Sequence, residues 1–185
     1  MEHTIIIAGS GGQGTLFLGR LMAYATLLED KEVTWMPSYG AEMRGGTANC
    51  TVIISDEMIG SPVVLNPHIL VVMNDASYAR FTGKLRPDGK LLYDSSLISR
   101  TDHRDDITAL GVPASMLSAT MNGTKLANMV MMGAFISSTG ILSLDSVVTA
   151  LDDITPPSRK NTIDLNKQLI VKGFDIIENK KGQHS

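Results

Sequence analysis

A glycine-rich turn near the start of the chain constrains the fold more than any other stretch. It reads Gly9-Ser10-Gly11-Gly12-Gln13-Gly14-Thr15 and follows the apolar run at 4–8. Leucine, methionine and alanine then recur at helical spacing between 18 and 28, so the order is strand, turn, helix. The G-x-G-x-x-G spacing of Gly9, Gly11 and Gly14 allows positive φ angles and close backbone approach to a ligand. We therefore predict that the turn and the helix N-terminus bind an anion, most often a phosphate, with the Thr15 hydroxyl as a further donor.

A simpler interpretation stays open, in which the glycines provide only the tightest route from strand to helix. A nicotinamide dinucleotide is less well supported as the ligand. The dinucleotide-binding motif includes an acidic residue about 20 residues after the glycines, at the end of the second strand. Here we expect the second strand at 33–36 to be stopped by Pro37, and the acid beyond it is Glu42, in a loop. No lysine follows Gly14, which excludes a P-loop. The predicted ligand therefore bears a phosphate and need not be NAD.

Length and charge set broad limits. A chain of 185 residues with 43% hydrophobic residues predicts one soluble globular domain spanning 1–185. The net charge of −3 gives no general electrostatic case for nucleic acid or an anionic membrane. The sequence contains neither a signal-peptide pattern nor an uninterrupted apolar run of about 18 residues, so we expect a cytoplasmic location and no membrane partner.

The single cysteine excludes a Cys-ligated iron–sulfur cluster held by this chain, which needs several thiolates. We interpret Cys50 as a buried structural thiol, because no nearby histidine could activate it. The histidines are scattered without metal-ligand spacing, so we predict no metal site and no functional role for them.

Alternating strand and helix signals predict an α/β layered fold. The apolar segment at 122–138 is expected to be a helix buried on most sides, with a partner-facing methionine surface as the alternative. Asn74 and Asp75 are both N-cap residue types and precede a short helix, and Ser143 can cap a helix at 144–154. A last amphipathic helix is expected at 161–179. Further strands are expected at 47–55, 69–73, 91–93 and 107–112.

A second loop follows the second strand, where α/β folds place ligand-binding loops. It contains Ser38, Tyr39, Gly40, Glu42, Arg44, Gly45 and Gly46. One interpretation is a ligand clamp in which Arg44 offers a forked donor to a phosphate or carboxylate. The other is an exposed turn in which Arg44 only pairs with Glu42.

The two loops together resemble the gamma subunit of 2-oxoacid:ferredoxin oxidoreductases. The similarity covers nearly the whole chain, through Ile59 and Pro62, 128–133, Asn166 and Gly173. It implies a three-layer Rossmann-like fold with a mostly parallel sheet. The small subunit of indolepyruvate oxidoreductase carries similar loops and is the nearest alternative. A stand-alone nucleotide-binding module and a nicotinamide or flavin oxidoreductase are further alternatives.

The resemblance also implies a division of chemistry among subunits. Enzymes of this family convert a 2-oxoacid and coenzyme A to an acyl-CoA, using thiamine diphosphate and iron–sulfur clusters. The gamma-type domain is associated with coenzyme A, while thiamine diphosphate and the clusters are expected on alpha, beta and ferredoxin-like subunits, with ferredoxin as electron acceptor. The 2-oxoglutarate branch looks closest. We predict no turnover by the isolated chain and assign no catalytic residue. The predicted coenzyme A-binding residues are Gly9, Ser10, Gly11, Gly12, Gln13, Gly14, Thr15, Ser38, Tyr39, Gly40, Glu42, Arg44, Gly45 and Gly46.

Overall fold

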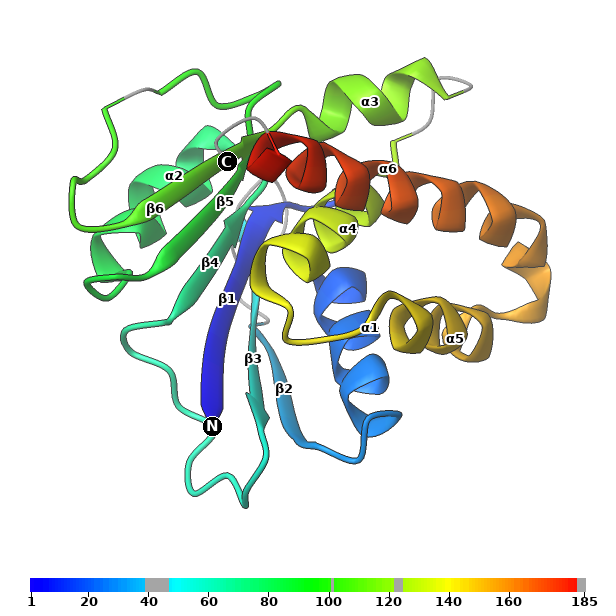
Figure 1. Ribbon diagram of the computed structural model, residues 1–185, viewed down its shortest axis with the longest axis horizontal. Coiled ribbons are helices and arrows are strands. Elements are labelled where there is room, and N and C mark those ends of the chain that lie inside the picture. Colours follow the sequence, from blue (N-terminus) through cyan, green and yellow to red (C-terminus); the bar gives the residue numbers. More distant parts are fainter. Residues whose placement is uncertain (39–46, 101, 122–124, 183–185) are drawn as a thin grey trace.

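The computed structural model describes residues 1–38, 47–100, 102–121 and 125–182, which are built around one twisted sheet (Figure 1). These residues form a six-stranded sheet in the order β2-β3-β1-β4-β5-β6. The strands β1, β4, β5 and β6 run parallel to one another, and β3 alone runs antiparallel, between β1 and β2. The predicted mostly parallel sheet is therefore confirmed. The strands are β1 (Glu2–Ser10), β2 (Glu32–Ser38), β3 (Thr47–Ser55), β4 (Ile69–Val72), β5 (Lys90–Asp94) and β6 (Thr108–Val112).

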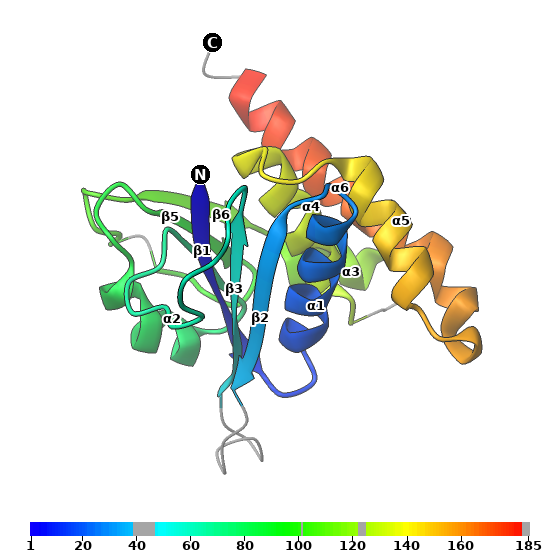
Figure 2. The same ribbon diagram turned by 90° about the horizontal axis from the view of Figure 1, so that it is seen from below.

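The helices cover the two faces of the sheet unequally, giving three layers (Figure 2). One face carries α2 (Asp75–Phe81) and the 3-10 turn η2 (Thr82–Lys84). The other face carries α1 (Thr15–Leu27), α3 (Ala114–Thr120), α4 (Ala127–Thr139), α5 (Leu144–Ile154), the 3-10 segment η3 (Pro157–Thr162) and α6 (Ile163–Gly182).

The central strand β1 shows why the apolar runs are continuous. Ile5 and Ile7 enter the larger core with Leu18 and Leu21 of α1, whereas Ile6 belongs to the smaller core beneath α2. Because successive side chains of a strand point to opposite faces, a strand covered on both sides is apolar at every position. This arrangement holds the end of β1, and the glycine turn after it, rigidly in place.

Helix α4 is buried on all sides, as predicted for the methionine-rich segment. Met131, Met132 and Phe135 have no exposed surface, so the alternative of a partner-facing methionine surface is wrong for this helix. Its contact with α6 is a backbone-to-backbone crossing. A Cβ added at Gly133 would lie 1.8 Å from the Ile170 carbonyl oxygen, and one at Gly173 would lie 1.9 Å from the Val130 carbonyl oxygen.

Several boundaries differ from the sequence expectations. Pro37 does not stop the second strand but lies within β2, opposite Cys50 of β3. An edge strand tolerates proline, because its outward N–H needs no partner. Helix α4 begins at Ala127, while 122–124 lie outside the described residues, and α3 was not expected. The last helix runs Ile163–Gly182 after the η3 segment instead of spanning 161–179.

Candidate functional site

The glycine turn leaves β1 at Ser10 and enters α1 at Thr15. Gly14 occupies the N-cap position with φ 76° and ψ 22°, and Gly12 has φ 91°. Both angles lie in the left-handed region that glycine adopts without strain. Gly9 and Gly11 are not among the positive-φ glycines of the described residues, so freedom at positive φ is needed at Gly12 and Gly14 only.

The first turn of α1 presents its backbone to solvent. Among the residues that the structure describes, no side chain caps this helix end, and Gly11 and Gly12 are exposed. The first N–H groups of α1, which have no partner within the helix, and the positive end of the helix dipole therefore face the turn, and such an arrangement favours anions in general. A Cβ at Gly14 would also lie 2.4 Å from the Asn128 amide nitrogen, which packs against the turn and donates to the Gly14 carbonyl oxygen at 3.3 Å.

Gln13 and Ser10 hold the turn in shape. The Ser10 N–H donates to Gln13 Oε1 at 2.6 Å, and Gln13 Nε2 donates to the Met73 carbonyl oxygen at 2.7 Å. The Ser10 hydroxyl accepts from Asn74, whose Oδ1 caps α2 at the Ser77 N–H. These side chains are hydrogen-bonded within the protein, so the turn exposes mainly its backbone.

Gly9 and Thr15, the first and last residues of the predicted glycine turn, are both shielded from solvent. Gly9 lies under the turn, where a Cβ would be 2.7 Å from Gln13 Oε1, and Thr15 is only 2% exposed. A ligand-binding role for the Thr15 hydroxyl stays a prediction, as does direct ligand contact by Ser10 and Gln13.

The second predicted loop begins at the same end of the sheet. Ser10 pairs with Thr47 and Ser38 pairs with Asn49, so β1 and β2 both end beside the start of β3 (Figure 2). The remaining predicted residues of that loop lie outside the described residues: Tyr39, Gly40, Glu42, Arg44, Gly45 and Gly46. The clamp role of Arg44 therefore stays a prediction.

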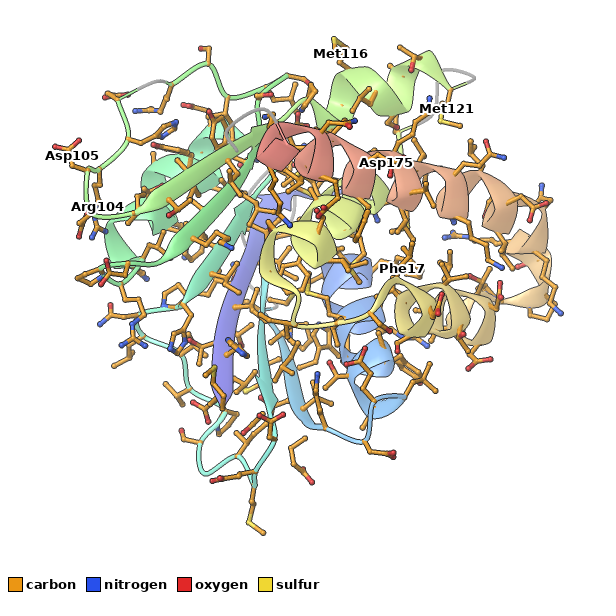
Figure 3. The ribbon with its side chains drawn as sticks, in the orientation of Figure 1. Phe17, Arg104, Asp105, Met116, Met121 and Asp175 are labelled. Atoms are coloured by element: carbon orange, nitrogen blue, oxygen red, sulfur yellow. The ribbon has the colours of Figure 1, made fainter. Side chains whose placement is uncertain are left out.

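Two clefts open on either side of the turn, and both are lined by Gly12 and Lys125. The first cleft, of about 400 Å³, lies between α1, the start of α4 and the η3–α6 segment, and Phe17 of α1 projects toward it (Figure 3). Its other lining residues are Gly14, Leu126, Asn128, Met129, Thr155, Pro156, Arg159, Thr162 and Asn166. The second cleft, of about 540 Å³, lies toward α3 and is lined also by Gly11, Gln13, Ser115, Ser118, Ala119 and Ala127.

Sequence reasoning did not place Lys125, Arg159 and Asn166 in the site. All three come from segments more than a hundred residues after the turn, and no local spacing connects them with it. Lys125 and Arg159 are exposed and have no acidic partner among the described residues. They make the first cleft cationic, which suits a phosphorylated ligand.

Buried polar groups position the walls of the site. Asp94 is fully buried and accepts from the Ser115 N–H at 3.1 Å and from the Ser96 N–H at 3.0 Å. It thereby holds the start of α3 beside the second cleft. On the other side of α1, the Cys50 thiol is buried and donates to the Thr15 carbonyl oxygen at 3.6 Å. Burial raises the pKa of this thiol to about 12, in agreement with the predicted structural role.

His68 and His103 take part in internal hydrogen bonds. His68 pairs with Thr4, and His103 bridges the hydroxyls of Tyr78 and Tyr93. Within 1–38, 47–100, 102–121 and 125–182, no three His, Cys, Asp or Glu side chains are grouped to hold a metal ion. Nor does any helix of the described residues have the length and apolar character to cross a bilayer.

These features define a class: an α/β protein with a Rossmann-like arrangement, in which an exposed glycine turn lies between two clefts. Comparison with known families makes the assignment specific. Residues 4–176 match the family described as pyruvate ferredoxin/flavodoxin oxidoreductase, and the chain belongs to that family. The resemblance stated from the two loops is confirmed.

Named relatives come from several branches. The chain is 36% identical over 176 residues to the ketoisovalerate oxidoreductase subunit VorA of Methanothermobacter marburgensis, covering 94% of this chain and 36% of VorA. It therefore spans about a third of the length of these first relatives. It is 34% identical to the 2-oxoglutarate synthase subunit KorC of Methanocaldococcus jannaschii, covering 95% of this chain and 94% of KorC.

Two solved structures share the fold. The gamma subunit of keto/oxoacid ferredoxin oxidoreductase from Geobacter sulfurreducens has a TM-score of 0.81 at 26% identity, covering 94% of this chain and 96% of that one. The 2-oxoglutarate:ferredoxin oxidoreductase from Magnetococcus marinus, solved with 2-oxoglutarate, coenzyme A and succinyl-CoA, has a TM-score of 0.88 at 23% identity. In that case the match covers 96% of this chain and 31% of the other.

Proposed function

We propose that this chain is the gamma-type subunit of a 2-oxoacid:ferredoxin oxidoreductase and binds coenzyme A at the glycine turn. The observation that supports it most is the uncapped turn at Gly12 and Gly14, with a cleft on each side. Coenzyme A has a matching layout, because its diphosphate lies between an adenosine end and a pantetheine end. The exposed backbone fits a diphosphate, and the cationic Lys125 lines both clefts.

The relatives guide the choice of substrate. We propose 2-oxoglutarate, because the match to KorC extends along 94% of that subunit, whereas only 36% of VorA is matched. The family match supports the further proposal that thiamine diphosphate and iron–sulfur clusters reside on alpha, beta and ferredoxin-like subunits, with ferredoxin as acceptor. When those groups are bound, they supply the decarboxylation and electron-transfer chemistry, and this chain holds the acyl acceptor.

An exposed apolar surface supports the proposal of partner subunits. Met58 is 90% exposed, Leu65 75% and Val63 67%, all on the segment between β3 and β4. Val63 also lines a groove of about 330 Å³ with Met36 and Pro37 of β2. Apolar side chains gathered in this way are typical of an interaction surface.

Gly12 offers a matched test of the turn. A Cβ there would meet nothing within 4 Å, and asparagine and aspartate both tolerate the left-handed region better than other side chains. The Gly12→Asp and Gly12→Asn variants therefore differ mainly by one negative charge beside the proposed diphosphate. In the assembled complex, we expect Gly12→Asp to bind coenzyme A at least roughly tenfold more weakly than Gly12→Asn, about 1.4 kcal/mol.

Isothermal titration calorimetry and the Michaelis constant for coenzyme A both report on this difference. Equal affinities in the two variants would show that no phosphate lies at the turn. Failure of the wild-type complex to bind coenzyme A, or to form with the partner subunits, would refute the proposed function.

A further inference from the structure

The hydrogen-bond ladder between β1 and β4 stops at the glycine turn, and Gln13 occupies the place of its next bond. The two strands pair in parallel up to Ala8 and Val72, and the Met73 N–H then donates to the Ala8 carbonyl oxygen at 2.9 Å. Because ladder bonds are evenly spaced in a parallel pair, the next one would join the Ser10 N–H to the Met73 carbonyl oxygen. The Gln13 carboxamide lies between these two groups instead. Its Oε1 accepts from the Ser10 N–H at 2.6 Å, and its Nε2 donates to the Met73 carbonyl oxygen at 2.7 Å.

A carboxamide carries the same acceptor and donor as a peptide group, so it can bridge two strand ends that have moved apart. The main chain of Gln13 closes the turn as well, because its N–H donates to the Ser10 carbonyl oxygen at 3.2 Å. Gly11 and Gly12, between these two residues, are exposed and have no side chain to hold them. Glycines lose the most conformational freedom on ordering, so bonds that order this turn in advance reduce the cost of binding a ligand.

The same bridge explains why position 9 is a glycine although Gly9 does not adopt a positive φ. A Cβ there would lie 2.7 Å from Gln13 Oε1, 2.9 Å from the Thr15 methyl carbon and 3.1 Å from Met73 Cβ. All three atoms belong to side chains, and the nearest is the end of a flexible one. An alanine at position 9 would therefore push the carboxamide away from the Ser10 N–H, so Gly9 is needed to leave room for it.

We propose that Gln13 is a positioning residue whose carboxamide bridges the ends of β1 and β4 and thereby orders the turn for the coenzyme A diphosphate. Gln13 acts on the ligand through the backbone of the turn, and Gly9 leaves the space that the bridge occupies. The inference rests on the proposed function, because it concerns how the turn receives that ligand.

The first test compares Gln13→Met, which keeps the length of the side chain but not its amide, with Gly9→Ala, which displaces the amide. Calorimetry and steady-state kinetics are measured on the assembled complex. Each variant should raise Kd and KM for coenzyme A at least about fivefold. The value of kcat at saturating coenzyme A should stay within about twofold, because ordering of the turn affects ground state and transition state alike.

A double-mutant cycle shows whether the two residues act as one unit. Both substitutions remove the same bridge, so the double variant should bind coenzyme A no more weakly than the weaker of the two single variants. Gln168→Met makes the matched change on the exposed side of α6 and should leave Kd and KM unchanged.

Hydrogen exchange of the complex without coenzyme A separates positioning from direct contact with the ligand. The Ser10 amide should be protected in the wild-type protein and should exchange at least roughly tenfold faster in Gln13→Met, because its acceptor has been removed. A side chain that acted only by touching coenzyme A would leave this exchange unchanged, and that result would overturn the inference even if Gln13→Met bound the ligand weakly.

The outcomes also separate this inference from the function on which it rests. If coenzyme A binds the wild-type complex and Gln13→Met keeps the same affinity, or if the two effects multiply in the double variant, the bridge is wrong and the proposed function stands. If the wild-type complex does not bind coenzyme A, both proposals fail. Should Gln13→Met not fold, Gly9→Ala tests the bridge in the same assays. A lower melting temperature with unchanged KM would show that Gln13 is purely structural.

Discussion

The backbone crossing of α4 and α6 predicts an unusually costly alanine substitution. Inside a helix, replacing glycine by alanine normally stabilises folding by roughly 0.5–1 kcal/mol. At Gly173, however, the added Cβ would lie 1.9 Å from the Val130 carbonyl oxygen and 2.8 Å from the Val130 carbonyl carbon. Ordinary contacts of this kind are about 3.4 Å or longer, so the helices must separate by about 1.5 Å.

Separation cannot be absorbed by a side-chain rotation, because the obstructing atoms belong to the backbone of α4. Val130, Met131 and Ile170, on the two helices, have no exposed surface, so a shift would open voids around them. Overpacking typically costs 1–3 kcal/mol, and the void adds to it. We expect Gly173→Ala to lower the free energy of unfolding by about 2–4 kcal/mol, which corresponds to a melting temperature roughly 5–15 °C lower.

Urea unfolding followed by far-UV circular dichroism measures this loss. Gly182→Ala is the matched control, since it makes the same change in the same helix at a site where a Cβ meets nothing within 4 Å. Its effect should stay within about 0.5 kcal/mol. If Gly173→Ala is as stable as wild type and Gly182→Ala, the close crossing is not a real constraint on the fold.

Three further perturbations follow from the structure. Burial raises the pKa of Cys50 to about 12, so iodoacetamide at pH 8 should label the unfolded chain readily and the native chain very slowly; rapid native labelling would contradict the buried position. Asn74→Ala removes the cap of α2 and should cost about 0.5–2 kcal/mol in urea unfolding, whereas Asn74→Asp retains the acceptor and should cost less; equal losses would argue against the cap. Burial alone would raise the pKa of Glu29, but hydrogen bonds from Lys31, the Ser143 N–H and Ser146 outweigh it and lower the pKa. The stability lost in Glu29→Gln should therefore be present above the ordinary pKa of 4.5 and be lost as pH falls through the lowered pKa of the folded state, and a difference that does not shrink below pH 4.5 would contradict this.

Much of the fold could be predicted from residues that are neighbours in the sequence. The strand Thr47–Ser55 and the helix Leu144–Ile154 have the predicted bounds, because turn residues and caps lie immediately beside them. Ser143 caps its helix as predicted, and of the two candidates before α2 it is Asn74 that caps the helix, while Asp75 is its first residue. Each cap accepts from the N–H three residues later. The burial of α4 could also be predicted from the sequence, since apolar residues lie on every side of the helix.

Long-range effects explain the boundaries that the sequence did not predict. Pro37 breaks strands in general, yet β2 is an edge strand and only the sheet order reveals this. Within the described part of the chain, helix α3 has no side-chain cap at Pro113, and its start is held by Asp94, about twenty positions earlier. Neither fact has a local signature.

The candidate site also has one part that the local sequence predicts and another that only long-range packing creates. The glycine turn was recognisable because strand, turn and helix are consecutive, but the clefts beside it are made by residues brought together through the α4–α6 crossing. Each of these helices carries a glycine at the crossing and an asparagine in the first cleft: Gly133 with Asn128, and Gly173 with Asn166. Seven residues of helix separate Asn166 from Gly173, about 10 Å along the axis, and both lie on the buried side of α6. The crossing that stabilises the core therefore also fixes Asn128 against the turn and Asn166 in the wall of the first cleft. A substitution that separates the helices should disturb ligand binding as well as stability.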